Sequence, residues 1–145
     1  MTMRIAAVLV VSMSLASSCS VGPCTLVGCQ NTVTIVLTPA MRSAFVVNEP
    51  VNAKSCIGAD CQTSVLTNTG GSSSSTNPAL TLAPNNGDII QSFSTRLSGA
   101  QRVTLELTKN GADAGTADVS GVMFTDFSPN GPGCGPTCQS VSISL

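Results

Sequence analysis

The chain of 145 residues contains no histidine, and this absence limits the chemistry that it can perform. Without histidine, the Ser-His-Asp and Cys-His catalytic arrangements are impossible. A catalytic pair in which a serine is the nucleophile and Lys54 or Lys109 is the base is still formally possible. Neither lysine lies in a recognisable motif. We expect the acidic residues to be solvated in turns or on the surface, with Glu106 pointing outward from a strand. The sequence therefore predicts a protein that is not an enzyme and that carries no cofactor.

Aromatic and charged residues are also scarce. There is no Trp and no Tyr, and we expect the four Phe to lie in the core rather than on a stacking surface. Charged residues make up 9% of the chain and the net charge is -1. The basic residues are scattered along the sequence, whereas nucleic-acid binding depends on the neutralisation of phosphates. We therefore expect no nucleic-acid partner.

Long apolar runs are missing except near the N-terminus. Arg4 is followed by unbroken apolar sequence over residues 5–11, which then gives way to small residues up to Ser18. This is the three-part pattern of a secretory signal peptide. It is shorter than the roughly 20 apolar residues of a membrane-spanning helix. The sequence predicts a cleaved signal peptide over residues 1–18 and an exported protein.

The end of this segment, Ala16-Ser17-Ser18-Cys19, resembles the cleavage site of bacterial lipoproteins. In that family the peptidase cuts just before a cysteine that carries lipid such as palmitate, and Cys19 is the matching residue. The resemblance implies a membrane partner reached through the lipid anchor. Ser20 stands where an aspartate would favour the inner membrane, so the resemblance implies the cell outer membrane of a Gram-negative source. The alternative is ordinary cleavage and secretion, because Ala16 and Ser18 also satisfy a small-x-small rule.

The remaining six cysteines fall in three close pairs along the chain. They are Cys24, Cys29, Cys56, Cys61, Cys134 and Cys138. Disulfides are the expected state in an exported domain, and the spacings together with the lack of histidine argue against a zinc site and any other bound metal.

The pairing of these cysteines is only partly predicted. We expect a local Cys56–Cys61 bridge that closes a hairpin. The other four either pair locally, as Cys24–Cys29 and Cys134–Cys138, or cross-link the first strand to the last. The cross-link is favoured slightly, because in many immunoglobulin-like sandwiches these two strands run side by side and parallel.

Residues 31–145 are predicted to form one all-β domain behind an anchored connector at residues 19–30. Apolar and polar residues alternate over residues 32–38, 79–83, 89–94, 102–109 and 140–145. Residues 51–57 and 62–67 are expected to form a hairpin, and Asn110-Gly111 predicts another whose second strand lies within residues 112–124. Residues 45–47 are expected to form a further short strand, and no segment shows a helical period. This pattern predicts a small antiparallel β-sandwich, with a small β-barrel as the alternative.

Function is the least determined property. The loops at residues 70–78, expected to be mobile, and 128–133, expected to be rigid, are candidate contact surfaces at an end of the sandwich. Asp113 and Asp118 flank Gly115 but lack the dense oxygen-ligand spacing of calcium loops, so a hairpin is favoured there. We predict an envelope-anchored lipoprotein with a non-catalytic structural or binding domain, whose partner is a protein or an envelope polymer. The alternatives are a secreted accessory module and a small envelope hydrolase.

Overall fold

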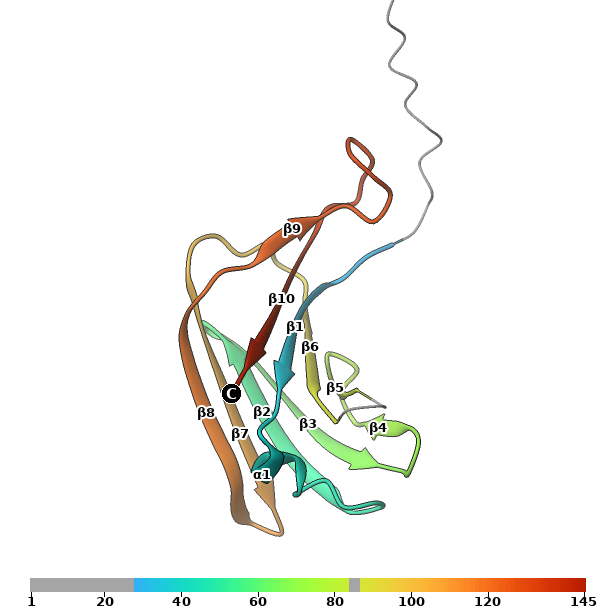
Figure 1. The fold of residues 1–145 in the computed structure, drawn as a ribbon, viewed down its shortest axis with the longest axis vertical. Coiled ribbons are helices and arrows are strands. Elements are labelled where there is room, and N and C mark those ends of the chain that lie inside the picture. The colour runs from blue at the N-terminus through green and yellow to red at the C-terminus, as the bar shows by residue number, and fades with distance from the viewer. Residues whose placement is uncertain (1–27, 84–86) are drawn as a thin grey trace, which may run out of the picture.

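The computed structural model describes residues 28–83 and 87–145, which form two five-stranded β-sheets that pack face to face (Figure 1). In spatial order, the first sheet contains β5 (Leu80–Leu82), β6 (Ile89–Phe93), β1 (Asn31–Val36), β10 (Cys138–Ser144) and β9 (Thr125–Phe127). The second sheet contains β4 (Ser73–Ser75), β3 (Asp60–Asn68), β2 (Pro50–Ile57), β7 (Gln101–Lys109) and β8 (Ala112–Val122). The predicted all-β sandwich is confirmed, while the predicted signal peptide and Cys19 lie outside the described residues.

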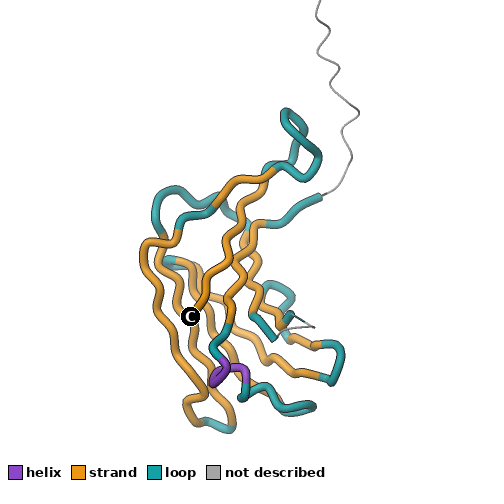
Figure 2. Tube along the Cα trace, viewed as in Figure 1, coloured by secondary structure: helices purple, strands orange, loops and turns teal. Residues whose placement is uncertain are grey.

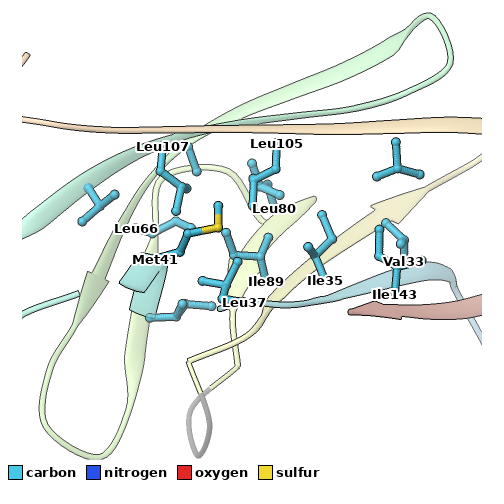
Figure 3. Close-up of a cluster of buried hydrophobic side chains, with 14 of the residues drawn as sticks. Val33, Ile35, Leu37, Met41, Leu66, Leu80, Ile89, Leu105, Leu107 and Ile143 are labelled. Carbon is cyan, nitrogen blue, oxygen red and sulfur yellow. The ribbon is translucent and has the colours of Figure 1, made fainter. Parts of the chain in front are cut away.

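The core lies between the two sheets. The alternation of side chains along a strand sends Val33 and Ile35 of β1 inward toward Leu105 and Leu107 of β7 (Figure 3). These four side chains are at most 1% exposed, so nearly all of their apolar surface is removed from water. Leu80 and Leu82 of β5 point inward as the sequence predicted, and Ile143 of β10 does the same.

The phenylalanines depart in one place from the expectation that all four lie in the core. Phe45 and Phe93 are buried, and the Phe124 ring packs edge-on against Phe93 with the ring centroids 5.1 Å apart. Phe127 is 39% exposed. It lies on β9, a three-residue strand at the edge of its sheet, where only one neighbouring strand covers it.

The first and last strands run parallel, as expected for an immunoglobulin-like sandwich. Val33 is opposite Val141 and Ile35 is opposite Ile143, and β1 also pairs with β6 in the antiparallel sense. The tube in Figure 2 shows β1 and β10 side by side near the centre of the first sheet. The other pairings between named strands are antiparallel.

Both predicted hairpins are present. β2 and β3 pair in a register that sets Cys56 opposite Cys61. β7 and β8 are joined by Asn110 and Gly111, which both have positive φ angles, of 53° and 79°. Two consecutive positive φ angles are the signature of a type I′ turn, whose twist matches that of the flanking strands.

The expected strand at residues 45–47 is not formed. Val47 makes a single isolated bridge to Asn68, and a one-turn helix, α1 (Pro39–Arg42), precedes it. Thr38 caps this helix by accepting a hydrogen bond from the Met41 N–H at 3.2 Å, and Pro39 occupies the first turn, where its missing N–H costs nothing. One turn is too short to show a helical period, so only the Thr-Pro pair signalled it.

The serine-rich segment at residues 70–78 is not a simple loop. It contains β4, which pairs with β3 and extends the second sheet by a short edge strand. Ser75 donates to the Leu80 carbonyl at 2.6 Å, and the Asn77 side chain donates to the Thr63 carbonyl at 3.1 Å. Serine and asparagine side chains bond readily to nearby backbone groups, and here those bonds fasten a segment that the sequence predicted to be mobile. The short strand β9 was not predicted either.

Gly115 allows α1 to pack against β8. Its φ angle is +145°, and a Cβ at this residue would lie 2.7 Å from Cγ of Met41. Met41 is buried among the core side chains (Figure 3), so it has little room to move away. A side chain at this position is therefore opposed both by the backbone conformation and by a direct clash.

We predict that Gly115→Ala lowers the free energy of unfolding by about 3 kcal/mol, measured by urea denaturation. Gly121→Ala in the same strand is the matched control. Gly121 also has a positive φ angle, of 77°, but no atom lies within 4 Å of the point that its Cβ would occupy. The control isolates the backbone term and should cost only about 1 kcal/mol. Equal losses in the two variants would show that the Met41 contact is unimportant.

Two buried glutamines in the first sheet differ in the hydrogen bonds that their side-chain amides make. Gln91 of β6 is fully buried, and neither its Oε1 nor its Nε2 has a hydrogen-bond partner among the described residues. Gln139 of β10 is also buried, but its amide accepts from the Leu97 N–H at 2.7 Å and donates to the Leu97 carbonyl at 2.9 Å. A buried amide without partners costs about 1–3 kcal/mol.

We predict that Gln91→Met raises the free energy of unfolding by about 1 kcal/mol, because methionine keeps the length of the side chain and removes the unpaired amide. Gln139→Met should lower it by a similar amount, since it deletes the two hydrogen bonds to the backbone of Leu97. Chemical denaturation of both variants tests this. A loss of stability in Gln91→Met comparable to that in Gln139→Met would contradict the assignment.

Candidate functional site

The charged side chains of the described part of the chain are largely paired with one another. Each of its five basic residues forms an ion pair; these pairs are Arg42–Asp88, Lys54–Glu106, Arg96–Asp126, Arg102–Asp118 and Lys109–Glu49. Of the two remaining acids, Asp60 accepts a hydrogen bond from Gln62 and Asp113 accepts one from the Gly115 N–H. Neither the five cations nor these acids form a cluster of like charge that would attract a charged ligand.

The serine–lysine pair that the sequence left open is not assembled in the described residues. Lys109 lies 2.6 Å from the Glu49 carboxylate and donates to the Ala44 carbonyl at 2.8 Å. These contacts hold the segment after α1 against the β7–β8 hairpin. Lys54 lies 3.6 Å from Glu106 across the β2–β7 pair, on the outer face of the second sheet. Within this part of the chain, neither lysine hydrogen-bonds a serine hydroxyl that it could deprotonate.

Asp88 corrects the expectation that the acidic residues are solvated. It is 3% exposed and lies directly before β6. Its Oδ1 accepts from the Arg42 guanidinium at 2.7 Å and from the Leu37 N–H at 3.3 Å. Because a buried carboxylate requires a partner, Asp88 acts as a structural link that ties α1 and the end of β1 to β6.

Asp113 and Asp118 lie on the strand β8 and are engaged separately. Arg102 donates to Asp118 through two guanidinium nitrogens, one of them Nε at 2.7 Å from Oδ1. This hydrogen bonding lowers the pKa of Asp118 below its ordinary value and raises the pKa of Arg102. Asp113 instead accepts the Gly115 N–H at 2.9 Å. Within residues 28–83 and 87–145, no three potential metal-ligating side chains come together.

The disulfides resolve the pairing that the sequence left open. Cys56 is bonded to Cys61, as predicted. Cys29 is bonded to Cys138, 109 residues away, with Cα atoms 6.0 Å apart, so the favoured cross-link is formed rather than the local pair. Cys134 is disulfide-bonded as well, and the prediction for Cys24 lies outside the described residues. These bridges place the protein in an oxidising, extracytoplasmic compartment.

The two loops that the sequence singled out lie at opposite ends of the sandwich (Figures 1 and 2). Residues 128–133 lie at the end where β10 begins, close to the Cys29–Cys138 bridge. Gly70 lies next to Val47, beyond the other end of β1. They therefore do not form one shared contact surface.

Two open hollows are formed by residues that sequence analysis did not connect. One, of about 380 Å³, lies over the outer face of the second sheet and is lined by Asn52, Lys54, Thr63, Thr76, Glu106 and Thr108 among others. The second, of about 550 Å³, lies beside the Cys29–Cys138 bridge and includes Gln30, Asn31, Asp60, Gln62, Ser92 and Thr137. Both offer hydrogen bonds to a polar ligand. Their members are brought together by strand register, which no local sequence signal encodes.

The edge strand β8 offers a different kind of surface. It has 11 residues, whereas β4, β5 and β9 at the other three sheet edges have three each. It carries no Pro, Lys or Arg, the residues that commonly protect such an edge, although two irregularities interrupt its register with β7. Met123, directly after it, is 61% exposed. Free backbone groups on a strand of this length can pair with another extended segment.

Two further observations bear on where and how the protein acts. No helix in the described part of the chain is both long and apolar enough to cross a membrane. Comparisons of the chain with protein-family models, with curated proteins and with solved structures find no match.

The Cys29–Cys138 and Cys56–Cys61 bridges should differ in their effect on stability. In the chain-entropy model, closing a loop of about 110 residues contributes about 5 kcal/mol, and closing one of about six residues contributes about 2 kcal/mol. We predict that Cys29→Ser/Cys138→Ser lowers the free energy of unfolding by about twice as much as Cys56→Ser/Cys61→Ser, measured by urea denaturation. A larger loss in the Cys56/Cys61 variant would contradict this ranking.

Proposed function

We propose that this protein is a bacterial envelope lipoprotein, anchored by lipid on Cys19, whose β-sandwich has a structural or binding role rather than a catalytic one. The cysteine arrangement carries the proposal. All five cysteines of the described residues are in disulfides, and four of them pair with one another. If the six cysteines after Cys19 form three disulfides, as the sequence predicts, Cys19 is the one left over.

The parallel course of β1 and β10 supports Cys24 as the partner of Cys134. In the sequence, Cys24 precedes Cys29 by five residues and Cys134 precedes Cys138 by four, and the strands that follow, β1 and β10, run parallel. We infer that Cys24 pairs with Cys134 on this ground. Cys19, the residue that matches the lipoprotein cleavage site, is then the cysteine available for lipid.

Lipid on Cys19 is sufficient to hold the domain at a membrane. Each buried methylene contributes about 0.8 kcal/mol, so one acyl chain binds marginally and two or three anchor stably. The Cys29–Cys138 bridge lies at one end of the sandwich, and α1 and the Asn110-Gly111 turn lie at the opposite end (Figure 1). Ser20 supports an outer-membrane destination in a Gram-negative cell.

The pairing of charges supports a non-catalytic role. A general acid or base needs a pKa suited to its task and access to a substrate, whereas the lysines here are held by carboxylates.

The long edge of β8 supports a binding role, because backbone hydrogen bonds to an extended protein segment are a common mode of recognition.

The anchor is tested by expressing the full chain with its own leader in a Gram-negative host. We expect the mature protein to partition into the detergent phase, with an intact mass that starts at Cys19 and includes acyl chains. Cys19→Ser should abolish both properties, and Ser17→Ala, which keeps a small residue, should preserve them. A wild-type protein that stays in the aqueous phase with an unmodified Cys19 would support the secreted module instead. Covalent labelling by a serine-directed activity probe would overturn the non-catalytic assignment.

The residue after Cys19 tests the destination in the same host. We expect Ser20→Asp to move the lipidated protein from the outer to the inner membrane, as judged by sucrose-gradient separation of the two membranes. Ser20→Ala is the matched control and should stay in the outer membrane. Equal distributions of the two variants would contradict an outer-membrane destination set by this residue.

A further inference from the structure

The Cys56–Cys61 bridge lies on the outside of the sandwich, unlike the bridge at its end. Ser55 and Ile57 point into the core, so the alternation of β2 turns Cys56 to the outer face of the second sheet. Cys61, directly opposite on β3, is exposed, and Cys56 is half-buried. In the other bridge, Cys138 is buried at the start of β10 and Cys29 is half-buried. A thiolate from another molecule can therefore reach the Cys56–Cys61 sulfurs from solvent.

The hairpin does not depend on this bridge. The rest of the β2–β3 register, from Pro50 opposite Thr67 to Ile57 opposite Asp60, is held by the strand pairing. β2 is also paired along its other edge with β7, and its inward side chains belong to the core. The bridge closes a loop of only a few residues, so it removes less entropy from the unfolded chain than the Cys29–Cys138 bridge does. Breaking it should leave the sheet intact.

The neighbouring charges do not favour one redox state strongly. Lys54 lies two residues before Cys56 on the same face and is paired with Glu106. Arg102 is two residues from Thr104, the residue opposite Cys56, and is paired with Asp118. The exposure of Cys61 therefore distinguishes this bridge from Cys29–Cys138, whose two cysteines are half-buried and buried. Exposed disulfides are the ones that exchange most readily with thiols.

We propose that Cys56–Cys61 is a thiol–disulfide exchange site, which an extracytoplasmic dithiol protein reduces and which re-forms by the reverse exchange with the disulfide of that protein, while the sandwich stays folded. The donor thiolate attacks Sγ of Cys61, the more exposed residue of the pair, forming a mixed disulfide and releasing Cys56 as a thiolate that takes up a proton. The second donor thiolate then attacks the donor sulfur of the mixed disulfide and releases Cys61. Two electrons pass to the cysteine pair, and the donor leaves as a disulfide. The exchange site does not depend on the lipid anchor.

The test uses the wild-type protein purified with its disulfides intact. Dithiothreitol is added without denaturant, samples are alkylated at intervals, and peptide mass spectrometry assigns the alkylated cysteines. We expect Cys56 and Cys61 to react at least about tenfold faster than Cys29 and Cys138. Far-UV circular dichroism should stay unchanged during this first phase. Equal rates, or a loss of β-sheet signal together with the reduction of Cys56–Cys61, would overturn the proposal.

Two further measurements sharpen the result. The Cys56→Ser/Cys61→Ser variant mimics the reduced pair, and its circular dichroism under native conditions should match that of the wild type. A variant that is unfolded would show that the bridge is structural and overturn the proposal. A brief reaction with limiting glutathione, quenched by acid, should place the adduct mainly on Cys61. An adduct mainly on Cys56 would contradict the proposed direction of attack.

Discussion

The parallel pairing of β1 with β10 is the constraint on which the rest of the structure depends. It brings the two ends of the folded domain into one sheet, with Val33 and Ile35 beside Val141 and Ile143. The Cys29–Cys138 bridge fastens this pair at the end where both strands begin. Without that contact, β10 and the short β9 would be separated from the other strands of the first sheet, because β1 is their link to them.

Because charged residues are scarce, most of the polar contacts on the surface are made by uncharged side chains. With few charged residues, each basic side chain of the described part of the chain has an acidic partner, and hydroxyl and amide groups supply most of the remaining side-chain hydrogen bonds. Ser75 and Asn77 fasten the β4 segment, and Gln139 fastens the loop at Leu97. These uncharged contacts give a surface suited to hydrogen bonding and to backbone pairing, rather than to binding a strongly charged ligand.

The predictions from sequence succeeded where the signal is local. The alternation over β7 and the Asn110-Gly111 turn are properties of neighbouring residues, so the hairpin, its inward side chains and its turn follow from them directly. The same holds for the Cys56–Cys61 bridge, whose two cysteines flank a tight turn. The helix α1 was missed because one turn cannot display a helical period, and β4 and β9 were missed because Ser73–Ser75 and Thr125–Phe127 lack the apolar alternation that marks β5. Asp88 was misjudged because its turn-like surroundings in sequence do not reveal the guanidinium of Arg42.

The sequence by itself therefore determined the β-sheet character of the domain, the faces of its long strands and its two hairpins, because each follows from residues a few positions apart. Tertiary structure alone decided that Cys29 meets Cys138, that Asp88 is buried and that β8 is a long edge strand. These features depend on the order of strands within the two sheets. Strand order is set by the packing of the whole core, to which residues far apart in the chain contribute together.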